Sequence, residues 1–109
     1  MKTLTIGDLK ARIPIIQGGM GVGISLSGLA SAVANEGGIG VISAAGLGLL
    51  YKKLSPSNYT EAGNLGLAEE IRKAREKAKG IIGVNVMVAL SDFAELVKTS
   101  ICLLYTSDA

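Results

Sequence analysis

The stretch that decides the fold runs from Ile13 to Ser43 and reads IPIIQGGMGVGISLSGLASAVANEGGIGVIS. Its first residues form a short apolar run that predicts a buried strand, which Pro14 can begin because proline donates no hydrogen bond to a ladder. Glycines crowd residues 18–24, and a second apolar run at residues 39–43 predicts another buried strand. Strand, glycine-rich loop, helix and strand together form the βαβ unit of a parallel sheet.

The helix between the two strands has the usual signals at its ends. Ser25 or Ser27 can cap it by accepting a backbone N–H, and Gly37 with Gly38 supplies a left-handed stop. Apolar residues at helical spacing, which we expect to face the sheet, are Leu26, Leu29, Ala30 and Val33. A glycine-rich loop before such a helix is where βα proteins hold flat or phosphorylated ligands, because backbone N–H groups can approach closely.

The remaining sequence continues the βα alternation after an irregular stretch. Residues 47–64 show no clear period and predict a loop, an insertion or a lid, with a plain surface loop the simpler interpretation around Asn58. Asn64 can cap a helix that Gly80 ends. Residues 81–88 predict a third strand. Ser91 or Asp92 can cap a further helix, whose expected sheet-facing residues are Phe93, Leu96, Val97 and Ser100.

The helix that follows Asn64 has one apolar and one charged face. The apolar positions are Leu67, Ile71, Ala74 and Ala78. The charged positions, which predict a solvated face, are Glu69, Glu70, Arg72, Lys73, Arg75, Glu76 and Lys77. Glu69 and Lys73 have the i,i+4 spacing that favours an ion pair.

Composition excludes several classes of function. The 109 residues carry 11 basic and 9 acidic side chains, and no basic run favours nucleic acid or an anionic membrane as a partner. Cys102 is the only cysteine and there is no histidine, so we expect neither an internal disulfide nor a metal site. Without a recognisable export signal, we expect a cytoplasmic protein.

Two alternative interpretations of the opening stretch remain. Residues 13–35 carry no charge and could span a bilayer by length, but proline, glutamine, serines and glycines interrupt them, so a strand–loop–helix explains them better. A dinucleotide-binding loop is poorly supported. The third fingerprint position holds Ile24 or Leu26 in the two possible frames, where glycine or alanine is required. The residues alone therefore predict an α/β protein with a glycine-rich ligand loop.

The order and spacing of the motifs resemble the start of the nitronate monooxygenase family, the 2-nitropropane dioxygenase-like flavoproteins. That family includes FMN-dependent enoyl-acyl-carrier-protein reductases. The resemblance rests on residues 13–43, 83–87 and 91–93, and extends roughly to Ser100. It implies the first βα units of a truncated FMN-binding (β/α)₈ TIM barrel, since a complete barrel needs about 250 residues. Residues 1–101 would be the N-terminal part of that domain, and residues 102–109, which resemble a translated adapter, a non-native tail.

The resemblance implies FMN contacts at Gly19, Met20 and Gly21, with the Met20 thioether packed against the flavin ring. The alternative is a tight turn that needs glycine for its own geometry. Asn85 lies in an otherwise apolar strand, where an unpaired amide would cost a few kcal/mol. The resemblance implies that Asn85 contacts FMN, and the alternative is an amide bonded to nearby backbone. Gln17 could bond the cofactor or a backbone group, and both roles stay open.

The resemblance predicts a parent FMN-dependent oxidoreductase, a nitronate monooxygenase that oxidises small-molecule alkyl nitronates with dioxygen. An FMN-dependent enoyl-acyl-carrier-protein reductase acting on an enoyl thioester is the alternative, as is a non-catalytic truncated fragment or flavin-storage module. We assign no catalytic residue, because the family's catalytic histidine lies in the second half of the barrel. Three βα units cannot close a barrel and leave an apolar edge, so we expect the isolated chain to aggregate or stay molten, without turnover. The oligomeric state stays open.

Overall fold

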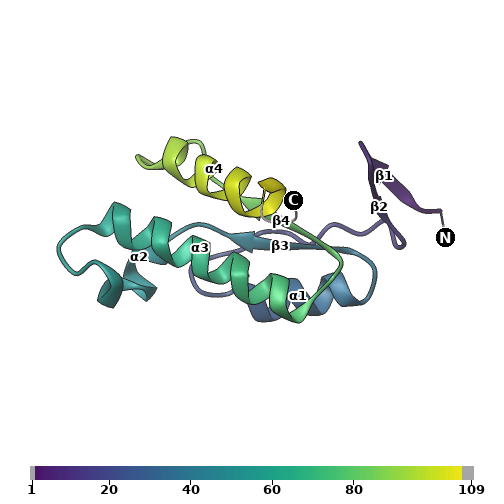
Figure 1. Ribbon diagram of the computed structural model, residues 1–109, viewed down its shortest axis with the longest axis horizontal. Coiled ribbons are helices and arrows are strands. Elements are labelled where there is room, and N and C mark those ends of the chain that lie inside the picture. The colour runs from purple at the N-terminus through teal and green to yellow at the C-terminus, as the bar shows by residue number, and fades with distance from the viewer. Residues whose placement is uncertain (1, 107–109) are drawn as a thin grey trace.

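The computed structural model describes residues 2–106 of the chain and shows a mixed α/β arrangement (Figure 1). The expected tail therefore lies partly outside the described residues, at positions 107–109. The strands and α-helices, in chain order, are β1 (Leu4–Ile6), β2 (Leu9–Ala11), α1 (Ser27–Asn35), β3 (Ile39–Ser43), α2 (Leu47–Leu50), α3 (Tyr59–Lys77), β4 (Ile81–Asn85) and α4 (Phe93–Ile101). A 3₁₀ turn, η1 (Lys52–Leu54), follows α2, and a π-helical turn, η2 (Cys102–Thr106), follows α4. No helix within residues 2–106 is long and apolar enough to cross a bilayer.

β3 and β4 form the centre of the structure as a parallel pair, in register from Ile39 opposite Ile81 to Ser43 opposite Asn85. Residues 13–17 lie along the other edge of β3, also parallel, through a single bridge between Ile16 and Ile39. The expected first strand is therefore present only as this bridge. Pro14 has no N–H to donate, and the next ladder donor, the N–H of Val41, is taken by the side chain of Gln17 at 3.0 Å.

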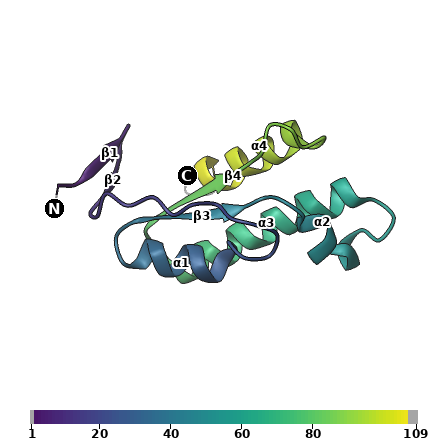
Figure 2. The same cartoon turned by 180° about the vertical axis from the view of Figure 1, so that it is seen from behind.

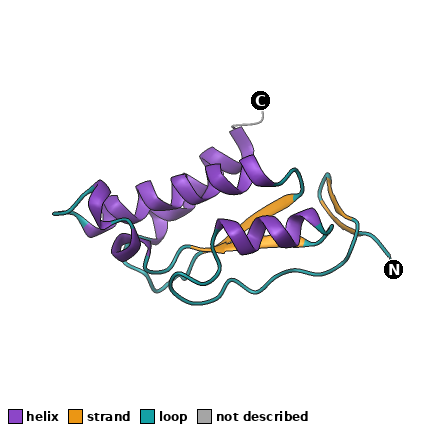
Figure 3. Cartoon of the chain, turned by 90° about the horizontal axis from the view of Figure 1, so that it is seen from below, coloured by secondary structure: helices purple, strands orange, loops and turns teal. Residues whose placement is uncertain are grey.

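The two faces of the β3–β4 pair are covered differently. Residues at even positions, such as Ile42 and Ile82, pack against α1, α3 and α4 in the main core. Figure 3 shows α1 lying across the two strands, and Figure 1 shows α3 beside it. Residues at odd positions face the opposite side. There the β1–β2 hairpin covers only the amino end of the strands, where Ala11 packs with Ile39 and Val41 (Figure 2).

Helix α1 departs from its predicted caps and stripe. It begins at Ser27 without a side-chain cap, because the Ser25 hydroxyl is buried and donates to the carbonyl of Val41 at 2.8 Å. Leu29 is 45% exposed, so its predicted place in the core is wrong. The buried face consists of small residues instead, namely Ser27, Ala30, Ser31 and Ala34. Small residues are required because the backbone of α1 passes close to β3 at Gly40. The left-handed stop at Gly37 is confirmed, with φ of 98°.

Residues 47–64 are mostly helical, so the prediction of an irregular loop is wrong, whereas an insertion or a lid stays a prediction. Helix α3 starts at Tyr59, where the side chain of Asn58 accepts the N–H of Glu61 at 3.0 Å. Asn64, the expected cap, lies inside the helix. Within this stretch Gly48 allows α2 to pack closely on α3, since a Cβ at Gly48 would lie 2.6 Å from the ring of Tyr59.

The apolar face of α3 is confirmed, but its charged face is only partly solvated. Leu67, Ile71, Ala74 and Ala78 are all buried. Glu70 is 4% exposed, which contradicts its predicted place on a solvated face. The ion pairs of this face have i,i+3 spacing and join Glu69 to Arg72 at 3.8 Å and Glu70 to Lys73 at 3.7 Å, in place of the expected Glu69–Lys73 pair.

The last strand and helix follow the prediction in part. β4 ends at Asn85, three residues earlier than expected, and Asp92 stands at the start of α4 without a side-chain cap. Leu96 and Ser100 are buried, and Phe93 and Val97 are half-buried.

Candidate functional site

The carboxyl ends of the three parallel segments lie side by side and carry polar side chains. Gln17 ends the first segment, and Ser43 and Asn85 are register partners at the ends of β3 and β4. The glycine-rich loop, residues 18–24, begins at the same place. We call this region the strand-end edge. Because ligands of parallel α/β folds bind outside the carboxyl ends of strands, it is the first place to look for a site.

Asn85 and Gly19, which the sequence singled out separately, are in direct contact. The Asn85 Nδ2 donates to the carbonyl oxygen of Gly19 at 2.9 Å. A Cβ at Gly19 would collide with the Cβ and amide of Asn85, so this approach requires glycine. Asn85 is exposed, whereas its position in the strand predicted a buried amide. Its Oδ1 accepts no hydrogen bond from residues 2–106 and is available to a ligand.

The rest of the loop is fixed through its carbonyl groups. The Ser43 hydroxyl donates to the carbonyl of Gly21 at 2.9 Å, and the Ser25 N–H donates to that of Met20 at 3.2 Å. Gly21 and Gly23 have φ of 67° and 77°, which glycine adopts without strain. In the described part of the chain, by contrast, the N–H groups of residues 18–24 donate to no other group. The loop therefore has donors without an acceptor among the described residues, beside a Met20 side chain that is 62% exposed.

Gln17 bonds to protein groups at both ends of its amide. Its Oε1 accepts the N–H of Val41 at 3.0 Å, and its Nε2 donates to the hydroxyl of Ser25. This is the backbone role of the two that the sequence left open, and a contact between Gln17 and a cofactor stays a prediction. Ser25 was expected as a helix cap, and its role as the partner of Gln17 was not predicted. A sequence signal for this role exists, since Ser25 is a hydroxyl residue between the apolar residues Ile24 and Leu26.

Comparison with known proteins identifies the family. The family model described as Nitronate monooxygenase matches residues 2–102. The chain belongs to the nitronate monooxygenase family. No curated protein matches the chain significantly.

Nitronate monooxygenases are oxidoreductases and are generally flavin-dependent. The family match includes every residue of the strand-end edge. Among residues 2–106, no group of three or more histidine, cysteine, aspartate or glutamate side chains is placed to hold a metal ion. The strand-end edge offers backbone and amide groups for hydrogen bonding, together with the soft thioether of Met20.

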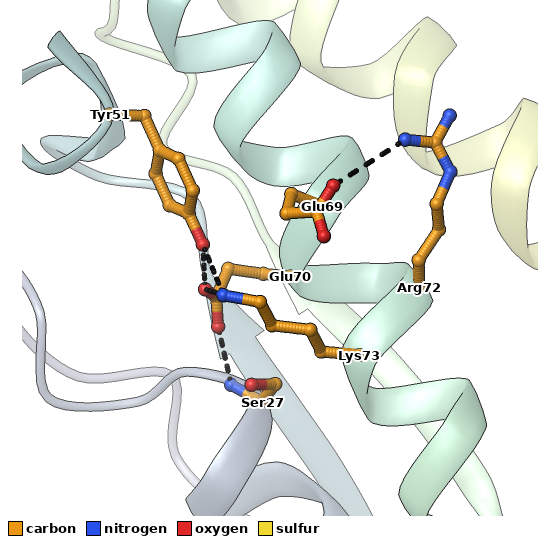
Figure 4. A network of polar contacts seen from close by, with 6 residues as sticks. All are labelled: Ser27, Tyr51, Glu69, Glu70, Arg72 and Lys73. Carbon is orange, nitrogen blue, oxygen red and sulfur yellow. Dashed lines mark hydrogen bonds and ion pairs between the residues drawn. The ribbon is translucent and has the colours of Figure 1, made fainter. Parts of the chain in front are cut away.

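In this family member, a second polar cluster lies on the helix side of the sheet (Figure 4). The Oε1 of Glu70, in α3, accepts the N–H of Ser27 at 2.8 Å, and its Oε2 accepts the hydroxyl of Tyr51. The ammonium group of Lys73 lies 3.7 Å from the same Oε2 and donates to the Tyr51 oxygen at 3.2 Å. These contacts join α1, the turn after α2, and α3 at one carboxylate. No local sequence signal indicates this role, because Glu70 lies among the charged residues of the helix face that was predicted to be solvated.

Charge and burial shift the pKa values of this cluster in opposite directions. Burial raises the pKa of the Glu70 carboxyl, but hydrogen bonds from Tyr51 and Ser27 and the charge of Lys73 outweigh it, so the pKa is lowered overall. Burial and the bond to Glu70 raise the pKa of Tyr51. The bond to Tyr51, followed by the charges of Tyr51 and Glu70, raises the pKa of Lys73. At neutral pH the carboxylate and ammonium are both charged and the phenol is neutral.

A hollow in the described part of the chain lies away from the strand-end edge. It has a volume of about 860 Å³ and lies along the free edge of β4, between hairpin residues 8–10 and the Phe93 and Val97 side of α4. Its floor is the strand itself, residues 81–84. Among the described strands, β4 pairs only with β3, so this hollow marks an unpaired strand edge and not a shaped ligand pocket.

Proposed function

We propose that this chain is the first part of an FMN-binding (β/α)₈ barrel in a nitronate monooxygenase that oxidises alkyl nitronates with dioxygen. Family membership supports the enzyme class. The order of residues 13–17, β3 and β4 as successive parallel segments supports the barrel, because successive barrel strands pair in this way. The hollow beside β4 is where a fourth barrel strand would pair. Within this proposal, the protein is cytoplasmic and acts on a small molecule, with no nucleic acid or membrane partner.

The observation that carries the proposal is the set of N–H groups on the glycine-rich loop that have no acceptor in the described part of the chain. An isoalloxazine ring is flat and has oxygen and nitrogen acceptors along one edge, which fits donors from residues 18–24. Gly19 and Gly21 let the backbone approach the ring, and the exposed Met20 can pack against its face. The Asn85 Oδ1 can accept from the ring N–H while its Nδ2 keeps the loop in place. The residues present therefore fit the flavin.

The same structure argues against a phosphate at this loop. In dinucleotide-binding folds, the phosphate sits on the N–H groups that begin the helix. Here the N–H of Ser27 is already bonded to the carboxylate of Glu70, which would also repel a phosphate. The loop thus serves the ring, and the phosphate would be held by later loops of the barrel.

When bound, FMN would supply the redox chemistry between the nitronate and dioxygen. The residues of this chain bind and orient the ring. We assign none of them to proton transfer, in line with a catalytic histidine elsewhere in the family's barrel.

The test of the activity is to read the source gene across codon 101 and to express the longest uninterrupted reading frame. We expect a yellow protein with bound FMN that consumes dioxygen with alkyl nitronates. Oxidation of NAD(P)H with an enoyl thioester would instead favour the enoyl reductase. Stoichiometric flavin without either turnover would favour a storage module, and a natural stop after Ala109 would contradict the enzyme.

The test of the site is the variant Asn85→Ala in that protein. Loss of the Gly19 contact and of the ligand-facing Oδ1 should weaken FMN binding about tenfold or more. Asn35→Ala is the matched control, because Asn35 bonds to Lys77 at the other end of the molecule. Equal FMN affinities in the two variants would contradict the assignment of Asn85.

A further inference from the structure

The carboxylate of Glu70 contacts the first residue of helix α1. The first N–H groups of a helix have no partner within the helix and are usually met by a side chain at its start. Helix α1 has no capping side chain of its own and no acidic residue in its first turn. Glu70 supplies both from α3, 43 positions along the chain, by accepting the N–H of Ser27 and placing a negative charge at the positive end of the helix dipole.

The start of α1 is also the end of the glycine-rich loop. Residues 18–26 run from Gln17, which is bonded to Val41, to Ser27, which is bonded to Glu70. Between these ends the loop contains glycines with left-handed backbone, which can change conformation at little cost. The loop is therefore defined by its two ends as much as by its own contacts.

We propose that Glu70 is a positioning residue for the cofactor-binding loop: its carboxylate, held by Tyr51 and Lys73, fixes the start of α1 and thereby the loop before it (Figure 4). This inference rests on the proposed function in one respect, namely that the loop contacts the flavin. The residue itself lies on the helix side of the sheet and touches no reacting atom.

Tyr51 and Lys73 have distinct tasks in this arrangement. A buried carboxylate is costly unless it is paired and hydrogen-bonded, and Lys73 supplies the charge while Tyr51 supplies a donor. The ring of Tyr51 packs against Gly66 of α3, and the Lys73 ammonium lies 5.5 Å from its centroid. The turn after α2 is thus joined to the same carboxylate, so a change at Glu70 reaches α1 and α2 together.

Three variants separate positioning from general stability. Glu70→Gln removes the charge, and Glu69→Gln makes the same substitution one residue away, where the carboxylate pairs only with the exposed Arg72. Ser27→Pro removes the N–H donor and leaves Glu70 intact. Proline is favoured at the first helical position, and Leu26 already has the extended backbone that a following proline requires.

The measurements use the protein expressed from the longest uninterrupted reading frame, as in the test of the activity, and begin without flavin. By NMR we expect the Ser27 amide proton to shift as Glu70 titrates in the wild-type chain and to stay constant in Glu70→Gln. Hydrogen exchange of the Ser25 amide, which closes the loop on Met20, should accelerate about tenfold or more in Glu70→Gln and Ser27→Pro. The Leu67 amide inside α3 should change much less, which a uniform loss of stability would not produce.

FMN titration, followed by flavin fluorescence, then tests the consequence for the ligand. We expect about tenfold or weaker binding in Glu70→Gln and Ser27→Pro, no further loss in the double variant, and wild-type affinity in Glu69→Gln. If the wild-type chain protects Ser25 but binds no FMN, the proposed function fails for this chain, whereas the positioning inference stands. A wild-type Ser25 amide without protection, or Glu69→Gln and Glu70→Gln variants that exchange alike, would overturn the inference.

Discussion

The two faces of the β3–β4 pair differ in what holds them and in what they can do. The helix-covered face is apolar and closely packed, with Ile42 and Ile82 against α1 and α3. The opposite face is covered by the hairpin only at its amino end, and at its carboxyl end it carries Ser43 and Asn85 bonded to the glycine-rich loop. The helix-covered face contributes most of the stability, and the opposite face carries the residues that would contact a ligand. Substitutions on the first face should therefore lower the unfolding free energy, and substitutions on the second should weaken ligand binding.

The largest expected difference in unfolding free energy is between alanine substitutions at two glycines, one on each face. A Cβ at Gly40 would collide with the backbone carbonyl of Ala30, so Gly40→Ala forces α1 away from β3. We expect it to lose more than about 3 kcal/mol of unfolding free energy, or the cooperative transition altogether. A Cβ at Gly83, on the opposite face, would lie 3.8 Å from Val41 in ordinary contact. Gly83→Ala should be neutral or stabilising by up to about 1 kcal/mol.

Chemical denaturation followed by circular dichroism measures both variants. The wild-type chain must first show a cooperative transition, which also tests the expectation that it is aggregation-prone or molten by itself. Similar losses in Gly40→Ala and Gly83→Ala would mean that the two faces are equally packed and would break the comparison.

The next largest effect is a cavity on the helix-covered face. Ile71, in α3, is 1% exposed and lies in the main core, and Ile71→Ala should cost about 2–5 kcal/mol of unfolding free energy. Ile81 is half-buried on the opposite face, beside the hairpin, and Ile81→Ala should cost clearly less. A larger loss for Ile81→Ala than for Ile71→Ala, by the same denaturation measurement, would reverse the assignment of the main core.

The apolar face of α3 and the strands β3 and β4 could be predicted because periodicity and turn residues act locally. The contact between Gly19 and Asn85 could be expected only in outline, since both lie at the carboxyl ends of parallel segments. The predictions failed where tertiary packing overrode the local sequence pattern. Residues 59–63 were expected in a loop, yet they lie inside α3, which begins at Tyr59.

Glu70 shows the other limit of sequence reasoning. Its neighbours Glu69 and Arg72 are charged and solvated, and the spacing of Glu70 along the helix gives no reason to treat it differently. Its burial depends on where α1 begins and where Tyr51 lies, and both are set by contacts distant in the chain. A capping role across 43 positions has no local signature, which is why the sequence analysis placed Glu70 on the surface.

A smaller effect, visible as pH dependence, distinguishes the buried from the exposed carboxylates. The pKa of Glu70 is lowered in the folded chain, so its contribution to stability is fully present above the ordinary glutamate pKa and is lost as pH falls through the folded value. We expect the unfolding free energy of the wild-type chain to fall in this acidic range. The fall should be reduced in Glu70→Gln, measured by denaturation at a series of pH values. An unchanged slope would show that Glu70 is not held as described.

The smallest effect on the unfolding free energy is expected at the exposed ion pair of α3. It serves as the reference for the effects of the other variants. Glu69 lies 3.8 Å from Arg72, with both side chains largely open to solvent, and such pairs contribute little because water and salt screen them. Glu69→Gln should therefore change the unfolding free energy by less than about 0.5 kcal/mol. Salt should have little further effect on the difference. If Glu69→Gln destabilised the chain as much as Glu70→Gln, the charge of this helix would act as a whole, and a specific role for the buried carboxylate at the start of α1 would have to be abandoned.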